Sequence, residues 1–109
     1  MQTKPENDTE LRLKINRETG RLPWSELLKH FAAGNLVWVA NSLDLVDVAV
    51  RISHDDKANI ALWMEAGLLG KVSDEQAHGW QEANAELWAV VVSPFILVQQ
   101  EKTVPASVH

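Results

Sequence analysis

Hydrophobic residues recur with a helical period in the segment that follows Pro23. Four of them are spaced i, i+3, i+4 and i+7, which places them on one face of a helix: Trp24, Leu27, Leu28 and Phe31. Proline is favoured at the first helical position, so we expect Pro23 to begin this helix. Gly34 is expected to end it, because glycine is common just after a helix.

An earlier helix is expected to start at Asp8 or Thr9, either of which can cap a helix, and to end at Gly20. Its apolar stripe is thin, with three members: Leu11, Leu13 and Ile15. The residues before it, 1–7, are polar and include Pro5. We therefore expect a disordered N-terminal tail at 1–7.

Residues 43–52 fit two patterns. As a strand, hydrophobic and polar residues alternate over 46–52. As a helix, the segment has a stripe made of Leu45, Val48, Ala49 and Ile52. Ser42 as an N-cap and Asp44 in the first turn favour the helix, because acidic groups there complement exposed N–H dipoles, and helix is our prediction.

Two further helices are indicated by their capping residues. Ser53 followed by Asp56 resembles a capping arrangement, and the helix it opens carries Ile60, Trp63 and Met64 on one face. Ser73 and Gln76 have the spacing of a full capping box, in which each side chain bonds the other residue's backbone N–H. That helix is expected to run to about residue 84.

Three segments rich in β-branched and aromatic residues predict strands: 36–40, 87–92 and 95–98. Ser93 and Pro94 separate the last two. A two-residue hairpin is not expected there, because such turns need positive φ and proline holds φ near −65°. One long strand bent at Pro94 and a looser turn remain as alternatives, and residues 68–72 read as a connector or a very short strand.

Together these elements predict an α+β fold, in which about five helices cover a small sheet of two or three apolar strands at 36–40, 87–92 and 95–98. The strands have almost no polar residues, so both faces of the sheet should be covered. The 109 residues suit one domain. We place it at 8–99, between the tail 1–7 and a frayed polar tail at 100–109.

Composition excludes several classes of protein. Hydrophobic residues make up 46% of the chain, which is enough for a core. The absence of cysteine excludes disulfides, thiolate zinc sites and cysteine nucleophiles. The N-terminal residues are polar, unlike a signal peptide, and the longest apolar run, 88–98, is far short of the roughly 20 residues that span a bilayer. We expect a cytoplasmic protein with no membrane partner.

The net charge of −5 is unevenly distributed. Residues 1–30 carry six basic and five acidic side chains, whereas residues 31–109 carry four basic and ten acidic ones. A nucleic-acid binder needs a basic stripe to displace counterions from phosphates. A helix–turn–helix with a β wing can be drawn over 44–98, but the helix after Ser73 carries only acidic charges, and we expect no nucleic-acid partner.

The densest group of polar residues combines carboxylates with a histidine and a lysine: Asp44, Asp47, His54, Asp55, Asp56 and Lys57. Histidine and carboxylates are the usual ligands of divalent metals. Helix capping explains several of these positions without any ligand, and the other histidines stand far away in the sequence. We predict no metal and no cofactor, and we keep 44–57 as the candidate segment for a small ligand or an ion.

No catalytic arrangement is assembled along the chain. None of the serines stands in a strand–turn–helix elbow, and the five glycines do not form a phosphate-binding loop. The five tryptophans are spread over five predicted elements: Trp24, Trp38, Trp63, Trp80 and Trp88. We expect them in the core, since each has a large area to bury; any that are half covered would form an interface patch.

Four stretches resemble, in order and spacing, the bacterial family catalogued as domain of unknown function 2288: PWSEL at 23–27, LDLVDVA at 43–49, VSDEQA at 72–77, and ELWAVVV at 86–92 with Pro94. The resemblance spans about residues 9–99. It implies a small stand-alone bacterial protein, and it carries over no activity and no catalytic residue.

The leading hypothesis is a non-enzymatic cytoplasmic interaction or regulatory module that associates with a protein partner or with itself. This hypothesis is motivated by the apolar strands, the abundance of tryptophan and the lack of an assembled active site. The alternative is a small metal- or ligand-binding protein that uses 44–57. An exposed apolar patch would favour the first hypothesis, and a pocket into which His54 and two aspartates converge would favour the second.

Overall fold

The computed structural model describes residues 4–101, and their side chains from residue 9 onward. Five helices and five strands make up this part of the chain, so the predicted α+β class is confirmed. In chain order they are α1 (Lys4–Glu18), β1 (Gly20–Pro23), α2 (Trp24–Ala32), β2 (Leu36–Val39), α3 (Leu45–Ser53), α4 (Lys57–Glu65), β3 (Leu69–Lys71), α5 (Asp74–Ala83), β4 (Glu86–Val92) and β5 (Phe95–Gln99).

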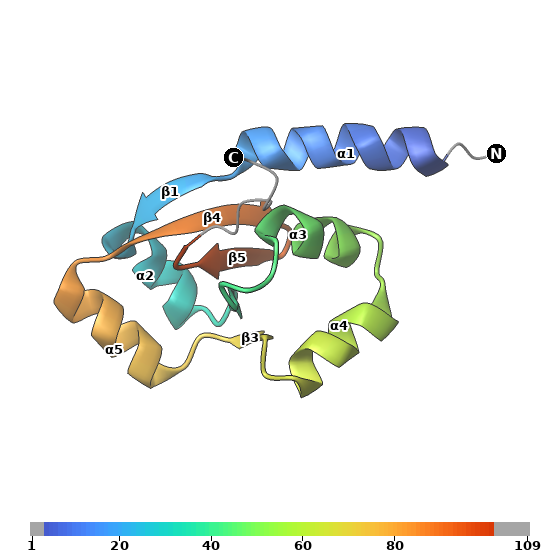
Figure 1. Ribbon diagram of the computed structural model, residues 1–109. Helices are drawn as coiled ribbons and strands as arrows, with labels where there is room; N and C mark the ends of the chain where they lie inside the picture. The colour runs from blue at the N-terminus through green and yellow to red at the C-terminus, as the bar shows by residue number, and fades with distance from the viewer. Residues whose placement is uncertain (1–3, 102–109) are drawn as a thin grey trace.

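The strands form one mixed sheet in the order β1-β4-β5-β2-β3 (Figure 1). β2 and β5 run parallel, and the other neighbours are antiparallel. The prediction of two or three strands was too low, because it missed β1 and counted β3 only as an alternative. Both are short edge strands that contain glycine, so each is formed by pairing with its neighbour rather than by its own strand propensity.

β4 and β5 form a hairpin with a two-residue connection, which contradicts the prediction for Ser93 and Pro94. Val92 pairs with Phe95, and the Ser93–Pro94 peptide bond is cis. The two-residue turns of the primed types need a positive φ, which proline does not adopt. A cis proline at the third position of a turn reverses the chain by another route, so the restriction on φ does not apply. Residues 87–98 are therefore two strands.

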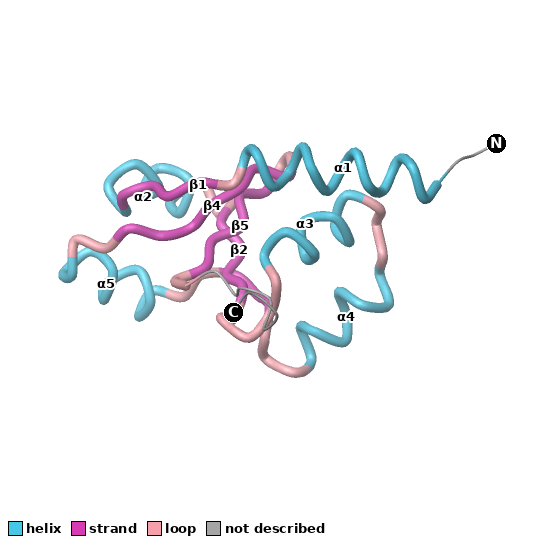
Figure 2. The backbone as a smooth tube through the Cα atoms, turned by 45° about the horizontal axis from the view of Figure 1, so that its top comes forward, coloured by secondary structure: helices cyan, strands magenta, loops and turns pink. Residues whose placement is uncertain are grey.

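The helices cover the two faces of the sheet separately. Figure 2 shows α2 and α5 on one side of the strands, and α1, α3 and α4 on the other. Each side has its own core: Trp24, Leu27 and Trp80 belong to the first, and α3 with Leu97 belongs to the second. The prediction that helices cover both faces is confirmed.

Four helix starts differ from the prediction. α2 begins at Trp24, because Pro23 is its N-cap and still pairs with β4. α1 begins at Lys4, so residues 4–7 are helical rather than part of a tail, and it ends at Glu18 because Gly20 already pairs with β4. α3 is capped by Asp44 instead of Ser42, and α4 by Asp56 instead of Ser53. In both cases a carboxylate takes the capping role from a nearby serine. The rest of the expected tails, residues 1–3 and 102–109, lies outside the described part of the chain.

Other predicted features agree with the structure. Residues 43–52 are mainly helical, as α3. The capping box of α5 is present, with Gln76 N–H donating to Ser73 Oγ at 3.0 Å and Ser73 N–H donating to Gln76 Oε1 at 2.9 Å. α2 ends before Gly34, whose φ of +81° is a conformation that suits glycine.

A buried glutamine joins the end of β5 to the segment between β2 and α3. Gln99 is fully buried, and its Nε2 donates to the carbonyl oxygens of Ala40 at 2.8 Å and Leu43 at 2.7 Å. Because two backbone carbonyls accept from one amide, the turn that begins α3 is held against the sheet.

Candidate functional site

An apolar groove opens on the side of the sheet that carries α1, α3 and α4. We call it the α1–α4 groove. It has a volume of about 870 Å³ and is lined by residues of α1, the end of α3, α4, β2, β3 and the β4–β5 hairpin. Its volume lies within the roughly 300–1,000 Å³ range of ligand-binding clefts in proteins.

The floor of the groove belongs to the core. Ile15 of α1 and Leu69 of β3 are buried there, and Val37 of β2 and Ile52 of α3 are partly buried beside them. These four side chains come from elements far apart in the sequence. The groove is therefore a product of the tertiary fold.

Two large hydrophobic side chains at the rim of the groove reach solvent; we call them the groove lip. They are Met64 of α4, 56% exposed, and Phe95 of the hairpin, 37% exposed. Single exposed apolar residues are common, but two at the rim of one apolar concave surface form with it a patch of the kind that binds ligands or proteins.

The groove stays open because α1 and α4 are held apart. Both helices pack against α3, which lies between them (Figure 2). After α3 the chain turns at Asp55, whose φ of 57° is left-handed, and α4 then leads away toward β3. The turn sets the position of Met64, and the hairpin supplies the rest of the lip.

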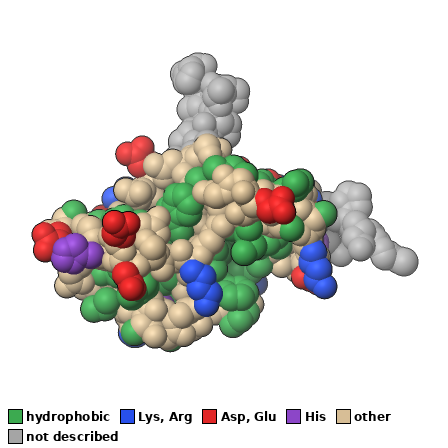
Figure 3. Space-filling model, turned by 90° about the horizontal axis from the view of Figure 1, so that it is seen from below, with side chains coloured by type: hydrophobic (Ala, Val, Ile, Leu, Met, Phe, Trp, Pro, Cys, Tyr) green, Lys and Arg blue, Asp and Glu red, His purple; other side chains and the backbone are tan. Residues whose placement is uncertain are grey.

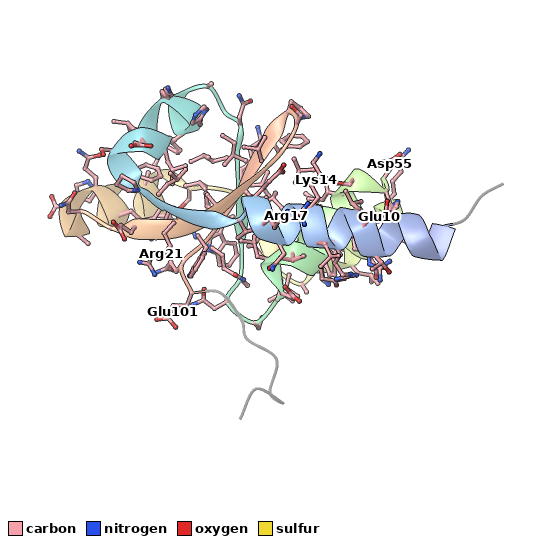
Figure 4. All side chains as sticks on the ribbon, turned by 90° about the horizontal axis from the view of Figure 1, so that it is seen from above. Glu10, Lys14, Arg17, Arg21, Asp55 and Glu101 are labelled. Carbon is pink, nitrogen blue, oxygen red and sulfur yellow. The ribbon has the colours of Figure 1, made fainter. Side chains whose placement is uncertain are left out.

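Four charged side chains line the groove: Lys14, Glu18, Asp55 and Lys71. Figure 4 shows Lys14 and Asp55 on the same side of α1. Lys71 Nζ donates to the carbonyl oxygen of Gly34 at 3.3 Å. Neither Lys14 nor Glu18 forms an ion pair with another described residue, so both charges are available to a ligand.

The six residues predicted as a candidate site do not converge on one point. Asp44 Oδ1 accepts from Val46 N–H at 3.0 Å and caps α3. Asp47 Oδ1 lies 3.0 Å from Arg12 Nη2 and 3.7 Å from Arg51 Nε, so it links α1 to α3. Both carboxylates therefore have structural partners.

Asp56 is also engaged in capping. Its carboxylate accepts hydrogen bonds from the side chain of Asn59 at 2.8 Å and from the backbone N–H of Asn59 at 3.3 Å. These bonds, with the nearby charges of Arg51 and His54, lower the pKa of Asp56 from its ordinary value of 3.8, although partial desolvation opposes them. The carboxylate is thus held ionised by groups of its own helix and turn.

The other predicted residues lie at the turn between α3 and α4. His54 ends α3, and Lys57 Nζ lies 3.9 Å from Asp55 Oδ2. Within residues 9–101, no three histidine, aspartate or glutamate side chains are grouped so that they could hold a metal ion. Of the six residues, Asp55 alone lines the groove.

The tryptophans divide into two groups. Trp24 and Trp80 are buried with ring centroids 5.5 Å apart, and Trp24 Nε1 donates to Gln81 Oε1 at 2.9 Å. This confirms the expected core role for these two. Trp38, Trp63 and Trp88 are partly exposed at the margins of the cores, and Arg21 stacks over Trp88 at 5.5 Å.

The sequence patterns did not indicate the groove lip. Met64 was expected on the packed face of its helix, yet it is exposed at the groove. Segment 87–98 is more apolar than a strand pair covered on both faces needs to be. This excess was the one sequence signal for the exposed hairpin residue.

Of the described helices, none has the length and apolar character to cross a membrane.

Comparison with known proteins agrees with this fold. The model of the family described as "Protein of unknown function (DUF2288)" matches residues 10–100. The solution NMR structure of PA1075 from Pseudomonas aeruginosa is similar, with a TM-score of 0.75, 36% sequence identity and complete coverage of both chains. No protein with a curated description matches the chain significantly.

Proposed function

The chain belongs to the family of proteins of unknown function DUF2288, and we propose that it is a non-enzymatic interaction module of the bacterial cytoplasm. Its binding site is the α1–α4 groove, and its ligand is an apolar face of a protein partner. The observation that carries the proposal is the groove lip, where Met64 and Phe95 stay exposed beside one concave apolar surface.

The exposed lip favours a protein over a small molecule. A small ligand is largely enclosed by its site, whereas here the apolar surface of the groove continues outward onto the exposed side chains of Met64 and Phe95. In Figure 3 hydrophobic side chains reach the surface around the end of the molecule that α4 forms. A partner that covers both the floor and the lip would bury all of this area, and methionine adapts well to such contacts.

The charges of the groove indicate what the partner carries. Lys14 and Glu18 stand one turn apart on α1 and have no ion-pair partner among the described residues. An amphipathic helix with apolar side chains spaced i, i+3/i+4 and i+7 would fill the groove. An acidic residue beside Lys14 and a basic residue beside Glu18 would complete the fit and set the direction of the helix.

The proposal is tested by substituting the lip. Met64→Glu and Phe95→Glu place a carboxylate where the partner's apolar face would lie, so each should weaken binding about tenfold or more, because a desolvated unpaired charge is costly. The partner is first captured from the source organism with the wild-type chain. Binding of the purified partner is then measured by calorimetry, and its footprint is mapped by NMR chemical shifts.

Leu28→Glu is the matched control, since Leu28 is an exposed leucine of α2 on the opposite side of the sheet. It should leave the affinity unchanged. A purified partner whose affinity is unaffected by both lip substitutions, or whose chemical-shift footprint lies outside the groove, would contradict the proposal.

A second candidate is a small apolar ligand with a cationic group. The groove volume of about 870 Å³ is large enough, and Asp55 and Glu18 supply carboxylates at its edge. Titration of the chain with alkylammonium probes, followed by NMR, separates the two candidates. Saturable shifts confined to the groove floor, in the absence of any protein partner, would favour the small ligand.

A further inference from the structure

α4 is covered less than the other helices whose side chains are described in full. It has no buried residue, although most of its positions are apolar. Ile60 and Trp63 face the core and are partly buried there, while Leu62 is 62% exposed on the other side. A helix that is apolar all round is normally enclosed. In Figures 1 and 2 α4 lies at the outer end of the molecule, with no described element beyond it.

The exposed side of α4 has a regular composition, and we call it the outer face. Its members are Lys57, Ala58, Ala61, Leu62 and Glu65, all exposed. With 3.6 residues per turn, positions 57, 58, 61, 62 and 65 fall on one side of the helix. Along the helix axis Leu62 lies near the middle of this face, within about one turn of Ala58 and Ala61. Lys57 and Glu65 lie at the two ends.

The charges of the outer face run against the dipole of their own helix. The first turn of a helix favours acidic groups and the last turn favours basic ones. α2, α3 and α5 each carry acidic residues in the first turn, and α2 and α3 carry basic ones in the last. α4 instead starts with Lys57 and ends with Glu65. Neither charge therefore stabilises α4 through the helix dipole.

We propose that the outer face of α4 binds the same face of a second copy of this chain, with the two helices antiparallel. The two-fold axis passes beside Ala61, so Lys57 lies opposite the partner's Glu65 and Glu65 lies opposite the partner's Lys57. Leu62 of each copy packs onto the small side chains at 58 and 61 of the other. A two-fold contact uses the same surface twice, and this face complements itself in both charge and size.

Among the residues that the structure describes, Lys57 has one competing contact within its own chain. Its Nζ lies 3.9 Å from Asp55 Oδ2, but the two side chains are 84% and 78% exposed. Exposed pairs of this kind hold a side chain weakly, so Lys57 is free to turn to a second copy. Nine helical residues make a small contact, which predicts a weak, reversible dimer that salt dissociates.

This dimer is separate from the binding proposed for the groove. Met64 and Ile60 line the groove from the other flank of α4, and neither belongs to the outer face. Two copies joined through α4 would therefore keep both grooves open. Loss of dimerisation and loss of partner binding have different causes and can be measured independently.

The test uses charge exchange and sedimentation velocity from micromolar to near-millimolar protein at low ionic strength. Lys57→Glu leaves the outer face with acidic residues only, and Glu65→Lys leaves it with basic ones only. Each variant alone should associate about tenfold more weakly than the wild type, because like charges then face each other. Mixed together in equal amounts, the two variants should form a heterodimer, which a folding defect cannot mimic.

Leu62→Glu should weaken association at least as strongly, and Leu28→Glu on α2 should leave it unchanged. A wild-type chain that stays monomeric at millimolar concentration in low salt would overturn the proposal. So would a dimer that tolerates Leu62→Glu, or single-charge variants that fail to associate when mixed.

Discussion

Single carboxylates organise α3 and the turn that leads from it to α4. Asp44 and Asp56 cap the two helices, Asp47 bridges Arg12 and Arg51, and Asp55 adopts the left-handed turn conformation. Most of the carboxylates that first suggested a ligand site thus shape the backbone that frames the groove.

Asp56 makes a pH-dependent contribution to stability. Its pKa is lowered in the folded chain, first by the hydrogen bond from the Asn59 side chain. The folded state therefore binds this proton more weakly than the unfolded state does. The contribution is present above the ordinary value of 3.8 and is lost as the pH falls from there through the folded pKa.

Asp56→Asn isolates this effect, because asparagine still caps a helix but carries no charge. The difference in unfolding free energy between wild type and variant should shrink as the pH falls below 3.8, measured by urea unfolding at a series of pH values. The carboxyl resonance of Asp56 should titrate below 3.8 in the same range. A constant difference across the series would contradict the assignment.

At the scale of elements, the helices were more predictable than the strands. Each helix carries its own local signals, such as the apolar stripe of α2 and the capping box of Ser73 and Gln76. Capping also shows the limit of local reasoning: Ser42 and Asp44 are both good caps, and the sequence does not say which one the chain uses.

The edge strands and the groove depend on contacts that local patterns do not record. β1 exists because Gly20 to Pro23 pair with β4, more than sixty residues away. The hairpin at Ser93 and Pro94 depends on a cis peptide. Leu11, Ile52, Met64 and Phe95 meet at the groove only after the sheet has formed, so no spacing in the sequence identified them as a site.

The capping box of α5 gives a test at this scale. Ser73→Ala removes the acceptor for the Gln76 N–H and should lower the unfolding free energy by about 1 kcal/mol. Denaturant unfolding followed by circular dichroism measures the change. Ser25→Ala is the matched control, because Ser25 is exposed within α2 and alanine is the better helix former there. An equal loss in both variants would mean that the cap contributes nothing.

For the whole molecule, the central strands join the two cores, and β5 lies in the middle of the sheet. Its Leu97 lies in the core under α1 and α3, and its Val98 lies in the core under α2 and α5. Both side chains are fully buried. The neighbouring strands β4 and β2 also contribute to both cores, so the two layers of helices share these strands and neither layer can be lost without exposing the other.

This arrangement predicts cooperative unfolding of both layers. Leu97→Ala opens a cavity on one face and should cost about 2–5 kcal/mol. Hydrogen exchange measured by NMR should show protection falling equally in α3 and in α2, although Leu97 belongs only to the core under α1 and α3. Val98→Ala, on the opposite face, should reproduce the pattern at smaller cost. Protection lost from α3 alone would show that the layers unfold independently.

The strand order also has a consequence for how the chain is made. β4 and β5, the last two described strands in chain order, lie between β1 and the β2–β3 pair. Until residues 86–99 have left the ribosome, the three earlier strands cannot form one sheet, and the helix faces that pack on β4 and β5 stay uncovered. The newly made chain must therefore wait for this hairpin, and the sheet closes in one step after residue 99 has emerged.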